Sequence, residues 1–576
     1  MHARSLKSNV IFHYGMNIFR KKRKFTSNEI FPDEIFLDAQ NIPNFDTQQL
    51  EGKFETPITK MTVSLLGIFF ILIAVAFSWK LELTQVKRGE AFFSQSENNS
   101  LEKSLIFSER GIIYDRNGLE LAWNSQNDET DAFTERSYTE LPGLGHLLGF
   151  VSNPATDSEG NYWQTTFIGK DGTEKQYNEQ LAGTNGSKIL ESNVFGEVQS
   201  ENVIVQPKNG ENITLTIDAE LQSSLHDFIG KLARRNPFKG GTGVIMDVQT
   251  GEILALTSYP EYNPEILSRG SDSDAINGYI HNTQLPFLNR STDGLYTPGS
   301  VVKPFIAIGA LNEKLITPEK KILSTGSISI QNPYDPDLKS VFKDWKAHGY
   351  VDMRRALAVS SNVYFYEIGG GYEDQLGLGI KNIEKYLRLF GMGEKTDIDL
   401  NSDAKGLIPN PKWKKATFNG DPWRLGDTYN TAIGQYGFQV TPVQIVRATA
   451  ALANSGTLHT PHLVANDTTH KETTIPIDPE LFNVVHEGMR QAVTLGTAKI
   501  LEMPYVQVAA KTGTAQVGVS KKFVNSWVTG YFPYKNPQYA FTVLMEQGSA
   551  NNSTGAVFVM KDMLNWMNEN TPDYLN

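Results

Sequence analysis

An uncharged apolar run near the start of the chain limits how the rest of it can be arranged. The run from Met61 to Trp79 contains no charged residue, and Lys60 and Lys80 stand at its two ends. About twenty apolar residues cross a bilayer core as a helix. A buried core helix would have a similar composition, whereas a cleaved signal peptide would not follow a long polar segment. We therefore expect residues 61–80 to form an uncleaved, single-pass membrane anchor.

The segment before this run differs from the rest of the chain in composition. A basic cluster, Arg20 to Lys24, lies there, and residues 29–59 are polar, mildly acidic and rich in Asn and Pro. The cluster lies beyond the roughly 15–20 residues over which basic residues are counted toward the cytoplasmic side. Polar segments of this kind are typically disordered. We predict a disordered cytoplasmic tail at residues 1–60, an anchor in the cell membrane, and an extracytoplasmic location for everything after Lys80.

Composition excludes several classes of function. The 576 residues carry a net charge of −11, and acidic residues outnumber basic ones between Glu82 and Glu211. No basic face dominates, which argues against a nucleic-acid partner. The chain has no cysteine, so it has neither thiol catalysis nor disulfides. We found no histidine spacing typical of a metal site and no glycine-rich phosphate loop, so we expect no metal and no cofactor. The length predicts two or more domains.

The segment from Tyr296 to Phe305 combines a turn with the start of a buried helix. Its Pro-Gly pair predicts the turn, and the apolar run that follows predicts the helix. Ser300 then lies in the first helical turn, where free backbone N–H groups favour an oxyanion. Lys303 is three residues further on and lies on the same helix face. A hydroxyl beside an amine is one way to make a serine nucleophilic without histidine.

The pattern Ser-x-x-Lys alone is common, because it also begins at Ser100, Ser340 and Ser402. Two further motifs distinguish the match at Ser300. These are Ser360-Ser361-Asn362 and the only Lys-Thr-Gly of the chain, at Lys511-Thr512-Gly513. In this order the three motifs resemble the set shared by penicillin-binding proteins and serine β-lactamases.

A second resemblance lies closer to the anchor. The segment from Arg110 to Gly118 is similar to the Arg-Gly-x-Ile-x-Asp-Arg-x-Gly motif of class B penicillin-binding proteins. By itself it predicts a strand and a hairpin turn. We interpret its charged residues as a structural ion-pair network rather than as catalytic groups. The resemblance implies a non-catalytic, dimerisation-like pedestal at residues 81–212 and a transpeptidase domain at residues 213–576.

Strand patterns lie at both ends of the second domain, with helical patterns between them. A hairpin is predicted at Gly243–Met246 and Glu252–Ser258, and three further strands at Val506–Lys511, Asn525–Tyr531 and Tyr539–Glu546. The last helix, Ala556–Met567, has one apolar face. This order predicts an α+β domain in which helices layer an antiparallel sheet. The penicilloyl-serine transferase fold implied by the resemblance has this architecture.

The resemblance also implies the reaction and its nucleophile. Ser300 would take the acyl group of a D-Ala-D-Ala stem peptide, with the backbone N–H groups of Ser300 and Thr514 as the oxyanion hole. Lys303 would accept the proton, although the pKa of a free lysine is about 10.4. Burial and the charge of Lys511 would both lower the pKa of Lys303.

The remaining motif residues would bind the substrate or move protons. Ser360 would relay a proton to the leaving amine, and Asn362 would bond the substrate backbone. Lys511 would supply a charge for the terminal carboxylate of the substrate. The substrate-binding residues that accompany it would be Thr512, Gly513 and Thr514.

Several segments are similar to the elongation type of this class, among them Phe342–Trp345 and Trp423–Gln435. The chain departs from that type at Tyr436, where the usual motif has glycine. We predict a cell-wall transpeptidase that β-lactams inhibit. The alternatives are a division-type transpeptidase, a hydrolase such as a D,D-carboxypeptidase or β-lactamase, and a non-catalytic receptor. The resemblance implies a polytopic glycosyltransferase and a cell-shape scaffold protein as partners.

Overall fold

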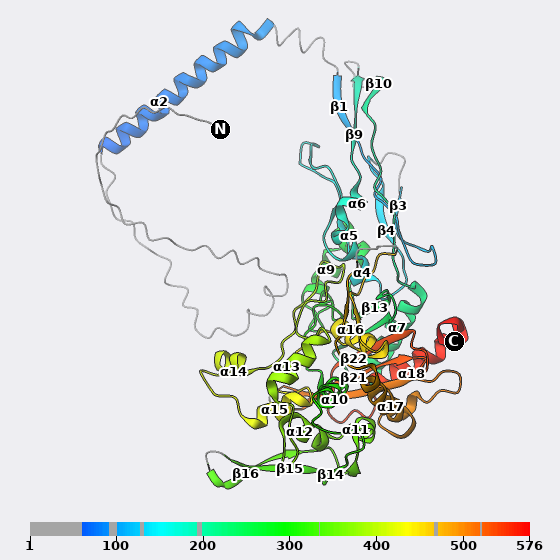
Figure 1. Ribbon diagram of the computed structural model, residues 1–576. Coiled ribbons are helices and arrows are strands. Elements are labelled where there is room, and N and C mark those ends of the chain that lie inside the picture. The colour runs from blue at the N-terminus through cyan, green and yellow to red at the C-terminus, as the bar shows by residue number, and fades with distance from the viewer. Residues whose placement is uncertain are drawn as a thin grey trace, which may run out of the picture. The chain divides into compact units, whose positions relative to one another are not determined.

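A computed structural model describes residues 60–90, 101–126, 132–192, 198–332, 335–465, 470–518 and 521–576. The predicted tail before Lys60, with its basic cluster, lies outside these residues. After the apolar helix, the described chain forms a pedestal built from small sheets and a larger head (Figure 1). The pedestal and the head are linked by direct hydrogen bonds and ion pairs.

The apolar run forms one helix, α2 (Lys60–Glu82), which a short π-helical turn, Leu83–Lys87, extends. None of its residues is buried in the protein. Among the described residues it is the one helix that is long and apolar enough to cross a membrane. This helix spans the run in which the sequence predicts a single anchor, and its length and composition are consistent with that prediction.

The two larger sheets of the pedestal have three and four strands. One is antiparallel with the order β1-β9-β10, and Figure 1 shows it at the end of the pedestal away from the head. Its strands are β1 (Leu101–Ile106), β9 (Gly186–Ser192) and β10 (Val198–Val205). The other sheet has the order β11-β2-β3-β4, with β2 (Ile113–Tyr114), β3 (Glu120–Ser125), β4 (Glu135–Tyr138) and β11 (Ile213–Thr214).

The predicted hairpin after Arg110 is confirmed, because β2 and β3 pair antiparallel around a turn at Gly118. β11 pairs parallel with β2, so the chain completes a pedestal sheet as it enters the head. Short elements fill the pedestal between β4 and β9: the paired strands β5 (Val151–Ser152) and β8 (Ile168–Gly169), β6 (Ala155–Thr156) and β7 (Tyr162–Gln164), and the helices α4 (Gly145–Leu148), α5 (Gly172–Gln176) and α6 (Asn178–Ala182).

The charged residues of the Arg110 motif form structural contacts, as predicted. Nε of Arg110 lies 2.5 Å from one oxygen of Glu174, and Nε of Arg136 lies 2.7 Å from the other, with all three side chains fully buried. Burial alone would raise the pKa of Glu174, but the two guanidinium groups outweigh it and lower that pKa. Arg116 contacts Glu252 of the head at 3.5 Å. The network therefore holds the pedestal together and joins it to the head.

The head is built on a five-stranded antiparallel sheet with the order β13-β12-β22-β21-β20. Its strands are β12 (Gly240–Asp247), β13 (Ile253–Tyr259), β20 (Ala509–Val517), β21 (Phe523–Phe532) and β22 (Tyr539–Ser549). The predicted hairpin of the first two strands and the predicted positions of β21 and β22 are confirmed.

The prediction for β20 was wrong at both ends. Pairing begins at Ala509, opposite Tyr531, rather than at Val506, and it continues past Lys511 to Val517. β21 ends at Phe532, directly before Pro533, which has no N–H for a sheet ladder. Val506 therefore has no strand residue opposite it, and it is buried in the core instead.

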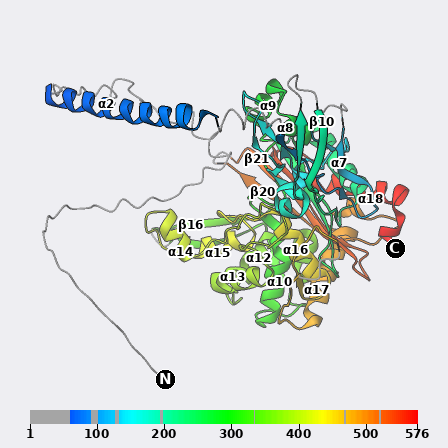
Figure 2. The ribbon, with the colours of Figure 1, turned by 90° about the horizontal axis from the view of Figure 1, so that it is seen from above.

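Helices cover both faces of this sheet, as predicted (Figure 2). α7 (Ala219–Arg235) and α18 (Ala556–Asn570) pack on one face, and α16 (Pro442–Ala453) packs on the other. Residues alternate between the two faces along each strand. In β12, for example, Ile245 joins the α7 and α18 core, while Val244 and Met246 join the core on the α16 side.

The helical part on the α16 side carries two of the three sequence motifs, at Ser300 and at Ser360, and the third lies on β20. The helical part contains α10 (Lys303–Asn312), α11 (Met353–Val359), α12 (Asn362–Gly370), α13 (Gly379–Leu389), α14 (Pro411–Thr417), α15 (Leu425–Ala432) and α17 (Pro479–Leu495). Two hairpin-like pairs border it, β14 (Ile322–Ser324) with β17 (Gly349–Val351), and β15 (Ser327–Asn332) with β16 (Asp335–Lys343). α8 (Pro264–Arg269), α9 (Ser273–Ile280), β18 (Thr457–His459) and β19 (Glu472–Thr474) complete the head.

Candidate active site

Ser300 lies in a tight turn between the sheet and the buried helix α10. Residues Gly299–Val302 form a 3-10 turn, η2, and α10 begins at Lys303. Gly299 has a φ of 58°, a conformation that glycine adopts without strain. The indole N–H of Trp527, on β21, donates to the carbonyl of Thr297 at 3.0 Å. The sheet therefore holds this turn, in which Ser300 is partly exposed while Val301 and Val302 are buried.

A second loop supports the turn through direct backbone contact. The N–H of Gly299 donates to the carbonyl of Gly434 at 2.9 Å. Gly434 has a φ of 77°, and a Cβ atom at this position would lie 2.1 Å from the carbonyl oxygen of Gly299. Only glycine fits here without moving the turn.

The mutation Gly434→Ala should therefore slow acylation of the protein by a fluorescent penicillin. A misplacement of about 1 Å can cost roughly 100-fold in rate, so we expect a loss between about 10-fold and 100-fold. Gly420→Ala is the matched control, because Gly420 has a similar φ of 87° but nothing within 4 Å of an added Cβ. Equal acylation rates in the two variants would contradict a role for the Gly434 contact.

Lys303 is a buried amine that faces the Ser360-Ser361-Asn362 motif. Its Nζ donates to the carbonyl of Ser360 at 2.8 Å, to Oδ1 of Asn362 at 2.8 Å and to Oγ of Ser360 at 3.3 Å. The side chain is fully buried. Burial lowers its pKa from 10.5 to about 7, against the opposing effect of the negative charge on Asp344. Near neutral pH a large share of Lys303 is therefore uncharged and able to accept a proton.

Ser360 and Asn362 lie in the tight connection between α11 and α12. Ser360 ends α11 with a φ of 56°, in the left-handed region that non-glycine residues seldom adopt. Ser361 caps α12, because its Oγ accepts from the N–H of Tyr364 at 3.3 Å. This strained turn directs the Ser360 hydroxyl and the Asn362 amide to Lys303.

Lys511 brings β20 to the same group of residues. Its Nζ donates to Oγ of Ser360 and to the carbonyl of Thr512, both at 2.8 Å. Burial, and then the charge of Lys303, hold the pKa of Lys511 well below its usual value. The sequence predicts that both burial and the charge of Lys511 lower the pKa of Lys303. The structure gives burial as the cause for Lys303, and the repulsion between the amines acts on Lys511.

The rest of the Lys-Thr-Gly segment packs beside Ser300. The hydroxyls of Thr512 and Thr497, at the end of α17, lie 2.6 Å apart. A Cβ at Gly513 would lie 3.0 Å from the carbonyl oxygen of Pro298, so β20 passes close to η2. Thr514 is exposed, and its backbone lies next to Gly299. The structure thus gathers Lys303, Ser360, Asn362 and Lys511 and places the Ser300 turn against the same strand.

Sequence reasoning missed three contributors to this arrangement. Asp344 lies beneath the Ser360 turn, Gly434 supports the Ser300 turn, and Thr497 meets Thr512. Asp344 and Gly434 fall in segments that carried the resemblance, but nothing in their spacing indicated these contacts. The Gly434 contact joins segments far apart in the sequence, and the other two join different elements, 17 and 15 residues apart.

Tyr436 occupies the position at which the chain departs from the elongation-type motif. It has a φ of 69°, which explains why glycine is usual there. Its ring packs against Trp413 and Trp423, each at 5.8 Å between centroids, and stacks on Phe418 at 6.4 Å. The aromatic packing stabilises the left-handed backbone, and the contact of Gly434 with the Ser300 turn is kept.

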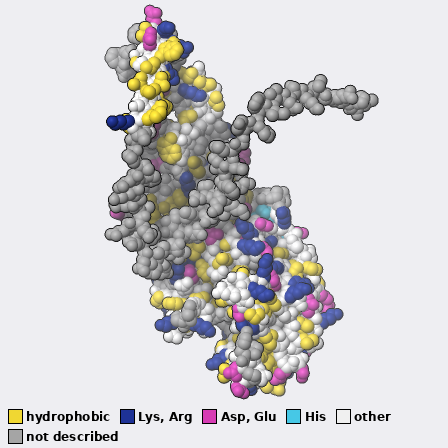
Figure 3. Space-filling model, turned by 90° about the vertical axis from the view of Figure 1, so that its left-hand side faces the viewer, with side chains coloured by type: hydrophobic (Ala, Val, Ile, Leu, Met, Phe, Trp, Pro, Cys, Tyr) yellow, Lys and Arg dark blue, Asp and Glu magenta, His cyan; other side chains and the backbone are white. Residues whose placement is uncertain are grey.

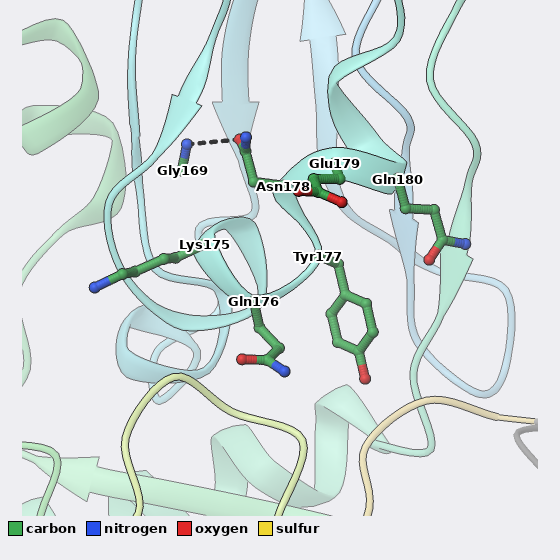
Figure 4. Close-up of a pocket in the computed structure, with 7 residues that line it drawn as sticks. All are labelled: Gly169, Lys175, Gln176, Tyr177, Asn178, Glu179 and Gln180. Carbon is green, nitrogen blue, oxygen red and sulfur yellow. Dashed lines mark hydrogen bonds between the residues drawn. The ribbon is translucent and has the colours of Figure 1, made fainter. Parts of the chain in front are cut away.

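A pocket on the pedestal is separate from this group of residues (Figure 4). It is lined by the α5–α6 segment, and the hydroxyl of Tyr177 donates from there to Asp399 of the head at 2.7 Å. Its lining residues are Gly169, Lys175, Gln176, Tyr177, Asn178, Glu179 and Gln180. They contain no serine with a buried amine, so the acyl-transfer chemistry does not belong to this pocket. The described residues contain no group of three or more His, Asp or Glu that could hold a metal ion.

Comparisons with known proteins agree with this geometry. The model of the penicillin binding protein transpeptidase domain matches residues 241–564, and that of the penicillin-binding protein dimerisation domain matches residues 129–215. The peptidoglycan D,D-transpeptidase MrdA of Salmonella typhimurium is 30% identical over 470 residues, which are 75% of this chain and 72% of the relative. MrdA of Escherichia coli K12 is 29% identical and covers 74% of this chain and 71% of its own length.

Solved structures are similar over most of the chain. PBP2 of Helicobacter pylori in complex with MreC has a TM-score of 0.67 and 28% identity, covering 81% of this chain and 99% of that one. PBP2 of Pseudomonas aeruginosa in complex with WCK 5153 has a TM-score of 0.66, 29% identity and the same coverage. The chain therefore belongs to the class B penicillin-binding proteins, the serine-type peptidoglycan D,D-transpeptidases that combine a transpeptidase head with a dimerisation domain.

Proposed function

We propose that Ser300 is the nucleophile of this peptidoglycan D,D-transpeptidase, which is of the penicillin-binding protein 2 (MrdA) type and a β-lactam target. Oγ of Ser300 attacks the carbonyl of the penultimate D-alanine of a stem peptide, and its proton passes to uncharged Lys303. The peptide bond to the last D-alanine breaks, which leaves an ester on Ser300. An amine from a neighbouring strand then attacks this ester, forms the cross-link and releases Ser300.

One observation carries this proposal: two buried amines donate to a single hydroxyl, Oγ of Ser360. A hydroxyl has two acceptor lone pairs and one proton to donate. Because Lys303 and Lys511 occupy the acceptor positions, the proton of Ser360 is free to go to the leaving amine. Asn362 holds Lys303 with its Oδ1, which supports a second role for its amide N–H₂ in bonding the substrate backbone.

β20, the strand that carries Lys511, can bind the end of the substrate. Lys511, Thr512 and Thr514 would hold the terminal carboxylate, with Gly513 allowing β20 to pass close to the Ser300 turn. The oxyanion would lie between the backbone N–H groups of Ser300 and Thr514. Donors of this kind are each worth about 2.7–4 kcal/mol in comparable sites.

The full-length chain in detergent, treated with a fluorescent penicillin, tests this function. We expect an adduct that mass spectrometry places on the peptide containing Ser300 and that decays slowly. Rapid release of hydrolysed penicillin would favour a hydrolase instead. The absence of any adduct would favour a non-catalytic receptor, and an adduct on another peptide would contradict the assignment of Ser300.

We propose that the chain has the domain order and the membrane topology of an elongation-type transpeptidase. We place the N-terminus in the cytoplasm, α2 in the cell membrane, and the pedestal (81–212) and transpeptidase domain (213–576) outside it. Support comes from α2, which is long and apolar enough to cross a bilayer. The relatives at about 30% identity include MrdA proteins, whereas the peptidoglycan D,D-transpeptidase FtsI of Buchnera aphidicola is 26% identical over 66% of this chain.

The proposed partners are a polytopic glycosyltransferase and a cell-shape scaffold protein that bind the anchor and pedestal. One similar structure is a PBP2–MreC complex, and another is a peptidoglycan synthase complex that coordinates polymerization and crosslinking, with a TM-score of 0.69 and 25% identity over 87% of this chain and 97% of that one. β10 offers a surface for such a partner, because apolar side chains are exposed along it. These side chains are Val198, Val203, Ile204 and Val205. By contrast, charged side chains of both signs are scattered over the face of the head that Figure 3 shows.

The mutation Ile204→Lys should reduce recovery of these partners with the full-length chain from solubilised membranes. Ile204 is 55% exposed, so the change alters the surface without opening the core. A charge placed in an apolar contact costs enough to reduce recovery about tenfold. Leu376→Lys, on an exposed loop of the head, is the control and should leave recovery unchanged. Penicillin labelling should be normal in both variants, and unchanged recovery with Ile204→Lys would contradict a role for β10.

A further inference from the structure

A buried carboxylate lies beneath the Ser360-Ser361-Asn362 turn. Asp344 follows β16 directly, and its side chain is fully buried. One oxygen, Oδ2, accepts from Oγ of Ser361 at 2.7 Å, from the N–H of Val363 at 3.0 Å and from Oγ of Ser324 at 3.2 Å. These partners come from two segments of the chain, so Asp344 ties the start of α12 and the turn before it to β14.

The carboxylate is placed where a helix favours a negative charge. It receives backbone N–H groups at the first residues of α12, at the positive end of the helix dipole. Burial alone would raise the pKa of Asp344, but bonds from the N–H groups of Asn362 and Val363 outweigh burial and lower it. Asp344 is therefore charged at neutral pH.

The residue before Asp344 reinforces the same turn. The carbonyl of Lys343 accepts from Nδ2 of Asn362 at 3.4 Å and from the hydroxyl of Tyr366 at 3.2 Å. Asn362 thus has its Oδ1 on Lys303 and its amide group on Lys343. The end of β16 fixes both the backbone and the side chain of the motif that Lys303 contacts.

We propose that Asp344 is a positioning residue of the acyl-transfer site, which holds the Ser360–Asn362 turn and sets the charge state of Lys303 through its own negative charge. This rests on the proposed function of Ser300 and Lys303. Asp344 does not reach the substrate itself. It acts through the hydrogen bonds to the turn and through its electrostatic attraction for the proton on Lys303.

The direction of the electrostatic effect follows from the surrounding charges. The negative charge of Asp344 raises the pKa of Lys303, against the larger effect of burial, which lowers it. Removing this charge should lower the pKa of Lys303 further, so that Lys303 loses its proton at a lower pH. The titratable and charged groups that face Asp344 or Lys303, directly or through a neighbour, are His348, Lys346, Arg355, Tyr366 and Lys511.

His348 is another titratable group beside Asp344. Its Nε2 lies 3.7 Å from Oδ1 of Asp344, and burial lowers its pKa. If the positive charge of protonated His348 controlled the reaction, replacing His348 would raise the pKa of Lys303, because one nearby positive charge would be lost. The two groups therefore predict shifts of opposite sign, and this separates them in an experiment.

The test measures the rate of Ser300 acylation by a fluorescent penicillin in the full-length chain between about pH 5 and 9, where the rate rises as Lys303 loses its proton. Asp344→Asn retains an oxygen for the three donors and removes the charge. We expect the midpoint of the rise to move to lower pH by about one unit. Asp344→Ala also removes the acceptor, and its maximal rate should fall about 10-fold to 100-fold. His348→Gln should not move the midpoint to lower pH.

Asp352→Asn is the matched control. Asp352 also caps a helix, α11, accepting from the N–H of Arg355 at 2.9 Å, and this hydrogen bond does not involve the Ser360 turn. We expect its midpoint and maximal rate to match those of the unmodified protein. An unchanged midpoint in Asp344→Asn, or an equal shift in Asp352→Asn, would overturn the role of Asp344 while the Ser300 adduct still forms. Failure of the proposed function looks different, because the unmodified chain would then carry no adduct on Ser300.

Discussion

Ser300→Ala should abolish covalent labelling of the full-length chain by fluorescent penicillin. The change removes the oxygen that forms the ester, and the remaining lysines and hydroxyls cannot replace it. Loss of a catalytic nucleophile costs about 10⁴-fold or more in comparable enzymes, so no adduct should be detected at exposures that saturate the unmodified protein. Labelling is read by gel fluorescence and the adduct is located by mass spectrometry.

The chain provides its own control for this prediction. Ser340 also begins a Ser-x-x-Lys match, with Lys343 as its lysine, but it lies on β16 and not in a buried turn. Ser340→Ala should be labelled at the normal rate. A thermal melt of Ser300→Ala should match that of the unmodified protein, because Ser300 is partly exposed and its neighbours are already packed. Persistent labelling of folded Ser300→Ala would exclude Ser300 as the nucleophile.

Lys303→Met should reduce the acylation rate about 10²-fold to 10⁴-fold, the range that general-base catalysis supplies. Methionine fills much of the same space and cannot accept a proton. In the unmodified protein the pKa of Lys303 is lowered to about 7, so its uncharged fraction falls as the pH drops through 7. The acylation rate should therefore decrease on the acid side of about pH 7, and this dependence should disappear in Lys303→Met.

Lys303→Arg separates the proton-accepting role from the charge. Arginine retains a cation but does not lose its proton in proteins, so this variant should be as slow as Lys303→Met. Lys314→Met, just beyond the end of α10, is the control and should keep the normal rate and pH dependence. Normal acylation in Lys303→Arg would show that a fixed positive charge suffices, and it would contradict the base assignment.

The architecture of the head could be predicted because its patterns are local. Gly243–Met246 and Glu252–Ser258 carry strand signals around a clear turn, and Val559, Met563 and Met567 are spaced to share one helix face. The start of β20 could not be predicted in this way. Val506 and Val508 are as apolar as strand residues, but the partner strand ends before Pro533, and only the assembled sheet reveals that limit.

The residues of the candidate site also fall into two groups, those that sequence patterns predict and those that only the folded chain brings together. Ser300, Lys303, Asn362 and Lys511 were identified because their motifs occur together in a known order. Asp344 was not, since its contacts depend on β16 ending beneath α12. For the pKa of Lys303, the sequence predicted the downward direction and burial as one cause, but not the opposing charge of Asp344, which depends on contacts made only in the folded head.

The position of β20 at the edge of its sheet has a consequence for selectivity. β20 pairs with β21 on one side only, so its other edge can add an extended peptide as a further strand. Main-chain pairing of this kind does not distinguish one side chain from another. An enzyme that binds the donor peptide through its main chain can accept stem peptides with different side chains. The groups around the ester must then distinguish the donor strand from the acceptor strand.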